Sequence, residues 1–336
     1  MSDDKAQRLQ PDTINRHVGN VYPALAMLAG MQLDVFSSIG DVARPVEDIA
    51  ADLEVSPTKL RPLLYAIVSA GLLDVDEQGN FSNTPESAEF LVKDSKRYIG
   101  GMHSAYADMW SSAMHTATSI RTGVPQAKHD FSVMSQQELR DFIIGIDAGA
   151  GASARRLHKE FDMSRFAHVL DAGGGAGGLA VGLARACDDL KATVAELPNV
   201  VPITRERVAD STVAERVDVI EADLVASPPS GSYDAIVMRS VLQVMSAKDA
   251  HATVKHCAQA LKPGGEMFAF GRMLDDSRLS PPDAVAVNVM FLNVYDDGQA
   301  YTESEYRSWF EDAGLTAIER KPVAGGYSIL SGSKPV

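Results

Sequence analysis

Cysteine is scarce in this chain of 336 residues, which contains two, Cys187 and Cys257. The two lie far apart, and neither stands at a metal-ligand spacing from other candidate ligands. Closely spaced cysteines are the usual sign of a disulfide framework or a structural zinc site. We therefore expect neither of these, and no metal site.

Long hydrophobic runs are also missing. The N-terminal stretch MSDDKAQRLQ is polar and lacks the apolar core of a signal peptide. The longest apolar stretch, residues 21–36, is interrupted by Pro23, Gln32 and Asp34, so it falls short of the roughly 20 apolar residues of a membrane helix. We expect a cytoplasmic protein with no membrane partner.

Positive charge is in deficit, since 31 Lys and Arg residues face 45 Asp and Glu residues and give a net charge of -14. Such a balance argues against DNA or an anionic membrane as the partner. The remaining composition, 45% hydrophobic and 23% charged, is that of an ordinary soluble globular protein. The length is sufficient for two domains.

The first part of the chain is predicted to be mainly helical. Apolar residues recur at helical spacing over residues 60–72, with Ser56 and Pro57 as the start signal and Gly71 as the stop signal. The following stretch LLDVDEQGNFSNT, residues 72–84, alternates and turns as a hairpin does. Helices followed by a two-stranded wing predict a winged-helix unit.

Winged helices often bind DNA, but the helix that would contact DNA carries only Lys59 and Arg61 as basic residues. Its remaining surface is strongly apolar, and the whole chain is acidic. An apolar helical surface that packs against a partner chain is therefore the better interpretation. We expect a winged-helix dimerisation domain over residues 1–100 and a helical linker that contributes to the substrate pocket over 101–160.

From about residue 166 the pattern changes to alternating strands and helices, which predicts a doubly wound parallel α/β sheet over residues 161–336. The expected strands are AHVLDAGGG, KATVAEL, VDVIEAD, YDAIVMRS, EMFAFGRML and YSILSGSK. The expected helices between them are GLAVGLARAC, DAHATVKHCAQAL and SEYRSWFEDAG.

A glycine-rich stretch, DAGGGAGG, follows the first of these strands and carries Asp171, Gly173, Gly175 and Gly177. Glycines at this place let the backbone turn tightly and approach a ligand at the carboxyl edge of the sheet. The glycines alone would also fit a dinucleotide-binding loop. However, an acid at the mouth of the loop suits a cationic or amine-bearing ligand better than a pyrophosphate.

Two further acids end the next strands. Glu196 in TVAEL can hold both hydroxyls of a ribose, and Asp223 in EADL can accept a hydrogen bond from an adenine amino group. Each acid alone is better explained as a solvated loop residue or a helix cap. Together with Asp171 they match a ligand made of an amino acid, a ribose and an adenine, which is S-adenosylmethionine.

At this point the chain resembles the class I S-adenosylmethionine-dependent methyltransferases of small molecules that carry an N-terminal winged-helix dimerisation domain. This is the O-methyltransferase family of plant and bacterial secondary metabolism. The resemblance covers about residues 14–334 and rests on the stretches LLYAIVSAGLL, SIRTGVPQ, VLDAGGGAGG, AELPNVV, EADL, ALKPGG and YTESEYRSWFEDAGL in the expected order.

The resemblance implies a Rossmann-like catalytic domain that binds S-adenosylmethionine and releases S-adenosylhomocysteine. It also implies a homodimer formed through the N-terminal domain, with the substrate between the two domains. Leu197, Leu224 and Arg239 are implied as further cofactor contacts, with Arg239 in place of the usual lysine.

The chain departs from the family where a proton has to be removed. The family usually carries a histidine at the position of Gln243, and that histidine takes the proton of the attacking hydroxyl. An amide has no useful basicity. Where the family often has a glutamate to orient the histidine, this chain has Gly271 and Arg272.

Three explanations stay open: a nucleophile with no proton to lose, a substitute base, or a protein that binds the cofactor without transferring a methyl group. His103, His115 and Glu303 are the candidate substitute bases. A substitute base would fit methylation of an oxygen or carbon of an aromatic metabolite. Alignment and exclusion of water would suffice for a thioether sulfur.

The thioether hypothesis is the most economical of the three, and it names Gln243 as the catalytic position. Under this hypothesis the chain resembles the S-methyltransferases of dimethylsulfoniopropionate synthesis, which act on 4-methylthio-2-hydroxybutyrate. Aromatic faces would stabilise the sulfonium product, and an arginine would hold the substrate carboxylate. The expected substrate-binding residues are His103, Tyr106, Trp110, Asp147, Arg272 and Tyr295.

Overall fold

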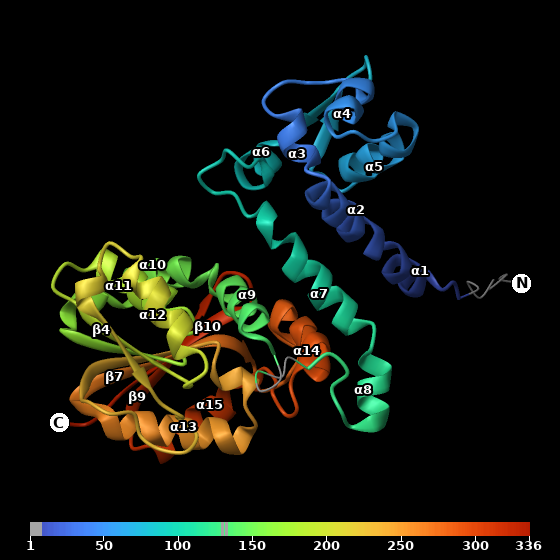
Figure 1. Cartoon of the computed structure of the whole chain (residues 1–336). Coiled ribbons are helices and arrows are strands. Elements are labelled where there is room, and N and C mark those ends of the chain that lie inside the picture. Colours follow the sequence, from blue (N-terminus) through green and yellow to red (C-terminus); the bar gives the residue numbers. More distant parts are fainter. Residues whose placement is uncertain (1–8, 129–130, 132–133) are drawn as a thin grey trace, which may run out of the picture. The chain divides into compact units, whose positions relative to one another are not determined.

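The computed structural model describes residues 9–128, 131 and 134–336, which form two compact units that meet between Met109 and Trp110 (Figure 1). Within these residues, no helix combines the length and the apolarity that a membrane crossing requires. Each unit has its own hydrophobic core.

The N-terminal unit consists of helices and one short hairpin. Its elements are α1 (Asp12–Gly19), α2 (Val21–Gln32), α3 (Val35–Ile39), α4 (Val46–Asp52), α5 (Pro57–Ser69), β1 (Leu73–Val75), β2 (Phe81–Asn83), α6 (Pro85–Leu91) and a 3-10 turn (Gly100–Met102). Helix α7 (His103–Ala113) runs across the boundary between the units. The predicted winged-helix pattern of helices and an antiparallel wing is confirmed.

The signals read from the sequence lie where they were expected, although the side chain of Ser56 makes no capping hydrogen bond to the start of α5. Ser56 precedes α5, Pro57 opens it, and Gly71 with φ +77° follows its last turn. The wing turns at Gly79, whose φ of +83° is a conformation that favours glycine. The core of this unit is formed by large side chains including Phe36, Leu64 and Phe81.

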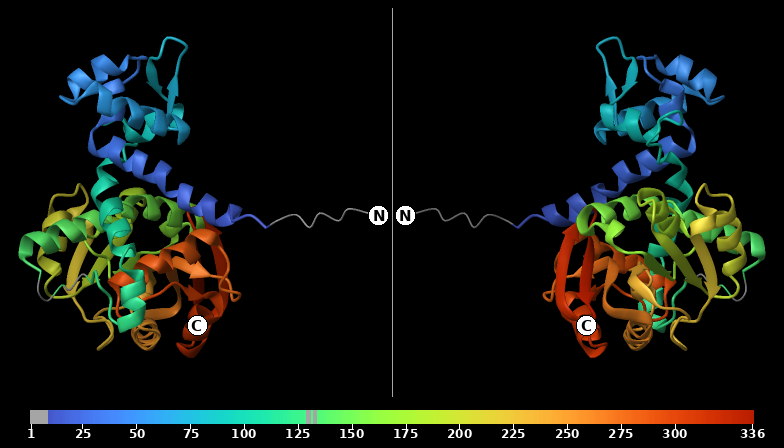
Figure 2. Two further views of the ribbon diagram at one scale, coloured as in Figure 1. Left: turned by 90° about the vertical axis from the view of Figure 1, so that its right-hand side faces the viewer. Right: turned by 90° about the vertical axis from the view of Figure 1, so that its left-hand side faces the viewer.

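Helices α1 and α2 follow each other through Asn20, which keeps helical backbone angles, so the pair continues in nearly one direction (Figure 2). Ile14, Val18, Val21, Tyr22 and Leu25 recur at intervals of three and four along this pair, and their side chains are 45 to 66% exposed. At this spacing they share one face. We name these five residues the α1–α2 stripe.

The C-terminal unit is a mainly parallel sheet with helices on both faces. The strands are β3 (His168–Ala172), β4 (Lys191–Glu196), β5 (Val217–Glu221), β6 (Tyr233–Arg239), β7 (Leu261–Leu274), β8 (Tyr301–Thr302), β9 (Thr316–Val323) and β10 (Tyr327–Ser333). Their order is β5-β4-β3-β6-β7-β10-β9, and β8 pairs with β7. The predicted Rossmann-like α/β fold is confirmed.

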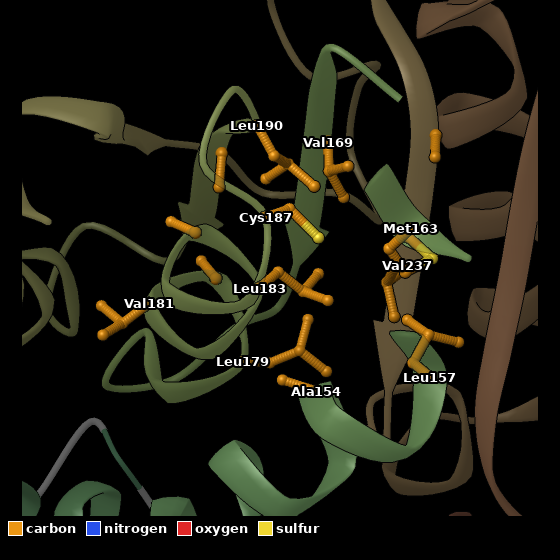
Figure 3. Packing of buried hydrophobic residues seen from close by; sticks show 14 of the residues in the cluster. Ala154, Leu157, Met163, Val169, Leu179, Val181, Leu183, Cys187, Leu190 and Val237 are labelled. Carbon is orange, nitrogen blue, oxygen red and sulfur yellow. The ribbon is translucent and has the colours of Figure 1, made fainter. Parts of the chain in front are cut away.

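Two hydrophobic clusters lie on opposite faces of this sheet. One packs α10 (Ala150–Phe161) and α11 (Gly178–Ala186) against the strands, and Figure 3 shows its side chains around Leu157, Leu179 and Val237. The other packs α13 (Ala247–Ala260) and α15 (Glu303–Asp312) against the opposite face. The remaining helices are α8 (Thr116–Thr122), α9 (Gln136–Asp147), α12 (Val201–Ala209) and α14 (Pro282–Val294), with 3-10 turns at Met163–Arg165, Ala214–Arg216 and Leu242–Val244.

The C-terminal end of the sheet differs from the purely parallel prediction. Strand β10 runs antiparallel to both β7 and β9, and β9 was not expected. Gly325 and Gly326, with φ of +76° and +71°, form the reversal between β9 and β10. Strand β9 is largely exposed and carries Glu319, Arg320, Lys321 and Pro322, and such residues are typical of an edge strand that is protected from pairing with other chains. With these residues the segment lacks the apolar alternation by which strands are usually predicted.

Strand β7 also begins earlier than predicted. It starts at Leu261, directly after α13, and includes the KPGG segment that we expected to separate helix from strand. Its pairing with β6 shifts register between Tyr233 and Ala235, so the added residues fit without disturbing the rest of the ladder.

Candidate functional site

The carboxyl ends of β5, β4, β3 and β6 lie side by side, because these strands are adjacent and parallel. Asp171 lies near the end of β3, Glu196 ends β4, Asp223 follows β5 by two residues, and Arg239 ends β6. Four residues that are far apart in the sequence are therefore brought to one edge of the sheet. We name this edge the carboxyl edge.

Asp171 is completely buried behind the glycine loop. Its Oδ2 accepts a hydrogen bond of 3.1 Å from the Ala180 amide, while its buried Oδ1 has no partner in the described structure. Burial raises the pKa of Asp171 to about 7, nearby Asp147 and Glu196 add to the rise, and the Ala180 hydrogen bond and Arg239 oppose it. An acid in this state favours a ligand that brings positive charge or donors.

The glycine loop, residues 173–177, needs its glycines. Gly173, Gly175 and Gly177 have φ of +69°, +59° and +84°. At Gly173 a Cβ atom would also stand 2.6 Å from Cγ2 of Val241, which belongs to the segment after β6. At Gly173 the loop therefore passes too close to the segment after β6 to leave room for a side chain.

Glu196 uses both carboxylate oxygens, one toward the glycine loop and one toward the backbone that follows β4. Its Oε1 accepts from the Gly175 amide at 2.9 Å, and its Oε2 accepts from the Leu197 amide at 2.7 Å. Burial raises the pKa of Glu196, and the two backbone hydrogen bonds oppose that rise. The neighbouring Leu197 side chain is exposed, although it is large and apolar.

Asp223 is exposed, and its Oδ1 accepts hydrogen bonds from the amides of Val225 and Ala226 at 3.0 and 3.2 Å. Its Oδ2 accepts no hydrogen bond from the described residues. Leu224 is buried, and its carbonyl oxygen lies 2.9 Å from Nδ1 of His256. These contacts fix the turn after β5 and leave one carboxylate oxygen open.

Asp147 and Arg239 contact the residues at the start of α11 and on α10. Asp147, the last residue of α9, accepts a hydrogen bond of 3.1 Å from the Gly178 amide at the start of α11. Burial raises the pKa of Asp147, while this hydrogen bond and the nearby Arg239 and Arg207 lower it. Arg239 donates from Nε to Ser153 at 3.0 Å. Asp147, predicted to bind substrate, thus contacts the start of the cofactor-side helix.

Gln243 lies in the 3-10 turn after β6 and is 7% exposed. Its Oε1 accepts a hydrogen bond of 2.8 Å from the backbone amide of Arg272 on β7. The Arg272 guanidinium extends elsewhere: it donates to the carbonyl of Gly325 and stacks 4.0 Å from the centre of the Tyr327 ring. A role for Arg272 in holding a substrate carboxylate stays a prediction.

The candidate substitute bases have other surroundings. Glu303 is paired with Arg307 at 2.8 Å and Arg320 at 3.3 Å, so both of its carboxylate oxygens are occupied. His115 is exposed at the start of α8, and Nδ1 of His103 lies 3.2 Å from the hydroxyl of its neighbour Ser104.

The aromatic candidates fall in different parts of the chain. Tyr106 belongs to the N-terminal unit, as does His103, and Trp110 begins the C-terminal unit. Tyr295 packs on Phe291 with ring centres 5.2 Å apart, and burial raises the pKa of Tyr295 to about 12. That all of these residues contact one substrate stays a prediction.

One residue at the edge was not anticipated from the sequence. Ser240 follows β6 with φ +58°, an uncommon conformation for a residue with a side chain, and its amide donates to the Phe270 carbonyl at 2.7 Å. This bend aims Val241 at Gly173 and leads the chain to Gln243. No local sequence pattern signals such a bend.

A cavity of about 490 Å³ opens beside the loop on the side of α10, α11 and α12. Arg155, Arg185 and Arg207 line it together with Asp147 and Asp210. Asp147 is the one predicted site residue among its lining residues, so this cavity is distinct from the edge formed by Glu196, Asp223 and Gln243.

Comparison with known proteins indicates the family to which the chain is similar. Residues 119–316 match the model of the O-methyltransferase domain. The tetracenomycin polyketide synthesis 8-O-methyl transferase TcmO of Streptomyces glaucescens is 27% identical over 323 residues, covering 94% of each chain. The 3-hydroxy-5-methyl-1-naphthoate 3-O-methyltransferase of Streptomyces sahachiroi is 28% identical over 319 residues, covering 92% of this chain and 91% of that protein.

A solved structure is similar over its whole length. The crystal structure of human N-acetylserotonin methyltransferase in complex with SAM matches with a TM-score of 0.83 at 22% identity, covering 100% of both chains. At this identity the likeness concerns the fold.

Proposed function

Because the chain belongs to the O-methyltransferase family, we propose that it transfers a methyl group from S-adenosylmethionine to a hydroxyl oxygen of a small aromatic metabolite. The carboxyl edge supplies the observation on which this proposal depends. Asp171 is buried, has a pKa raised to about 7 and keeps Oδ1 without a partner. An ammonium group bound against the loop would favour the ionised form of Asp171 through its charge, whereas a pyrophosphate would be repelled.

The remaining edge residues fit the other parts of S-adenosylmethionine. Asp171 and the loop would hold the amino-acid part, Glu196 would accept from the ribose hydroxyls, and Asp223 would accept from the adenine amino group. The exposed side chain of Leu197 offers an apolar contact for the adenine ring. When bound, this cofactor supplies an electrophilic methyl group on a sulfonium sulfur.

The acceptor is proposed to be an aromatic hydroxyl, because the two bacterial relatives are named as O-methyltransferases of a polyketide pathway and of a hydroxynaphthoate. What this chain's residues contribute on the acceptor side is orientation and exclusion of water rather than strong basicity. Gln243 cannot remove a proton, and Glu303 is held by two arginines.

The direct test is to incubate the protein with S-adenosylmethionine and a panel of phenols, naphthols and hydroxyanthraquinones, and to measure S-adenosylhomocysteine release. We expect turnover of at least one aromatic hydroxyl, with the methylated oxygen identified by mass spectrometry. Tight cofactor binding without product on any hydroxyl would contradict the proposal, and it would favour a protein that binds the cofactor without methyl transfer.

A second candidate is S-methylation of a thioether acid such as 4-methylthio-2-hydroxybutyrate. Gln243 motivates it, because a thioether sulfur needs no base. The comparisons do not support it, since the two relatives named above are oxygen methyltransferases. The Arg272 guanidinium, expected to hold the carboxylate, is engaged by Gly325 and Tyr327. Including thioether acids in the panel tests it, because turnover of thioethers alone would make it the better proposal.

We also propose that the protein forms a homodimer through the α1–α2 stripe, which exposes five large apolar side chains along one face. Burying such a face on a second copy would remove it from water. Replacing Val18 by Glu should convert the dimer to a monomer in light scattering coupled to gel filtration. Val42→Glu, at an exposed apolar residue outside the stripe, is the matched control. A wild-type protein that elutes as a monomer would contradict this proposal.

A further inference from the structure

We infer that Gln243 is a hydrogen-bond donor that selects an acceptor hydroxyl already ionised before methyl transfer. The substrate class would be acidic hydroxyls, such as phenols conjugated with a carbonyl or nitro group. This inference rests on the proposed methyl transfer to oxygen and narrows its substrate. It begins from the way the amide group is held.

The orientation of the Gln243 amide is determined by its partner. The group 2.8 Å away is the backbone N–H of Arg272, which can only donate, so the amide oxygen must face it. The amide nitrogen then has to point away from β7. Rotating the amide by half a turn would set two N–H groups against each other.

Gly271 makes this approach possible. A Cβ atom at residue 271 would stand 2.9 Å from Oε1 of Gln243, which is tighter than ordinary van der Waals contact. The residue before the hydrogen-bonding amide therefore has no side chain, and the Gln243 amide can lie directly on the strand. Gln243 and Gly271 act together as one fixed unit.

The other side of the amide is open. Gln243 is 7% exposed, yet its nitrogen neither donates to a described residue nor belongs to the buried atoms without a partner, which are Ser38 Oγ, Asp171 Oδ1 and His251 Nε2. The amide nitrogen of Gln243 is therefore not fully buried, and it forms a donor, held in place, in the turn after β6.

The charged and titratable groups on the elements around Gln243 include Tyr295, Asp296 and Asp297 after α14. Asp296 pairs with Lys128, and Asp297 is exposed. Tyr295 after α14 has a pKa raised to about 12 by burial and stays neutral. Asp249 at the start of α13 accepts from Ser246, and the Arg272 guanidinium on β7 is taken by Gly325 and Tyr327. Lys248 next to Asp249 is exposed.

A donor in this position favours an oxygen anion. Hydrogen bonds to a charged acceptor are stronger than those to a neutral one, so the amide lowers the pKa of a hydroxyl that binds against it. The hydroxyl proton goes to solvent before transfer. The oxygen lone pair then forms the bond to the methyl carbon while the carbon–sulfur bond breaks, and its electron pair returns to the sulfur. A thioether is a poor acceptor for this amide.

The test uses nitrophenols and nitronaphthols, whose absorbance reports ionisation, together with phenols up to the acidity of tyrosine, with pKa about 10. Each probe is titrated with pH in the presence of S-adenosylhomocysteine and the protein. We expect the bound nitro compounds to ionise at a pH lower by roughly one unit than in free solution, and we expect product release to favour the more acidic phenols.

Gln243→Glu separates the donor from the rest of the site, because a carboxylate still accepts from the Arg272 amide but replaces the free N–H groups by an acceptor. We expect phenolate binding to weaken roughly 10-fold to 100-fold, with cofactor affinity unchanged in calorimetry. Gln243→Leu should also abolish the shift in ionisation without adding charge. Gln78→Glu on the exposed wing turn is the control for the added charge.

The outcomes separate the two proposals. Bound probes that stay neutral in the wild-type protein, or phenolate binding that survives both Gln243 variants, would overturn the donor role while leaving oxygen methylation intact. A protein that binds the cofactor but neither binds nor methylates any phenol would overturn the proposed function, and the donor role with it.

Discussion

The two halves of the carboxyl edge differ in the charge of the side chains that they present. On the side of β3, β4 and β5 it presents Asp171, Glu196 and Asp223, and burial raises the pKa of the first two. On the side of β6 and β7 it presents an amide whose oxygen is already used, Gln243. Acidic groups gather where a cationic cofactor is proposed to bind, whereas the polar side chain in the turn after β6 is a neutral amide.

This difference teaches that cofactor binding and proton removal are separate requirements that one fold can meet separately. The cofactor half holds buried acids in place through backbone amides, as Glu196 does with Gly175 and Leu197. The acceptor half relies on the shape and direction of a neutral group.

The largest effect is expected at Asp171. Asp171→Asn keeps an oxygen for the Ala180 amide but removes the negative charge, so S-adenosylmethionine should bind about 100-fold more weakly. Isothermal titration calorimetry measures the change. Asp218→Asn, at an exposed position on β5, is the matched control. An unchanged affinity in Asp171→Asn would break the assignment of charge to the cofactor half.

Glu196→Gln should weaken cofactor binding by about 10-fold to 30-fold. An amide can accept from one of the two backbone donors, Gly175 or Leu197, but not from both with its two ends, so one N–H loses its partner. The dissociation constant from fluorescence or calorimetry reports the loss. Glu221→Gln, at the exposed register partner of Glu196 on β5, should bind as the wild-type protein does.

The pH dependence of cofactor affinity should report Asp171 directly. A cation favours the ionised form, so affinity should rise roughly tenfold between about pH 6 and about pH 8 and level off above the pKa of about 7. Binding below that pH should release a proton, measurable by calorimetry in buffers of different ionisation enthalpy. Affinity that falls over this range would contradict the raised pKa.

The same raised pKa should make the folding stability of the ligand-free protein decrease with pH, whereas the cofactor affinity increases. The folded state binds more protons than the unfolded state between the unfolded value of 3.8 and about 7, so its stability should fall as pH rises through that window. The raised pKa values of Asp147 and Glu196 act in the same direction. In Asp171→Asn this part of the slope should disappear from the thermal unfolding curves.

Gly271→Ala should give the smallest effect and should confine it to the acceptor half. The added Cβ would press on Oε1 of Gln243 and turn its amide, so phenol binding should weaken about fivefold while cofactor affinity stays the same. Gly145→Ala, where a Cβ would meet nothing within 4 Å, is the control. A loss of cofactor binding in Gly271→Ala would show that the two halves are coupled.

Much of the fold could be predicted from the sequence, as could the gathering of Asp171, Glu196 and Asp223 at one edge, because the signals are local. A strand that ends in DAGGG and the acids after the next two strands follow from short patterns, and parallel neighbours bring strand ends together. Strand β9 was missed because an exposed edge strand does not need an apolar face.

For the acceptor half, the sequence predicted only that a general base is absent at residue 243. The sequence indicated that Gln243 cannot be a base, but the donor role proposed for it depends on a contact with Arg272, 29 residues further along the chain. The positive φ of Ser240 and the contact between Asp147 and Gly178 likewise depend on tertiary packing. The Arg272 guanidinium contacts the turn after β9, which the sequence pattern had not revealed, and its expected role toward the substrate stays a prediction.

The two hydrogen bonds of Glu196 have a consequence for the thermodynamics of ligand capture. Both amides, those of Gly175 and Leu197, are restrained before any ligand arrives. The loop is therefore ordered when the protein folds, and the accompanying loss of conformational entropy does not oppose association with the ligand. A ligand that meets this loop finds it preorganised, and its binding enthalpy is available for affinity.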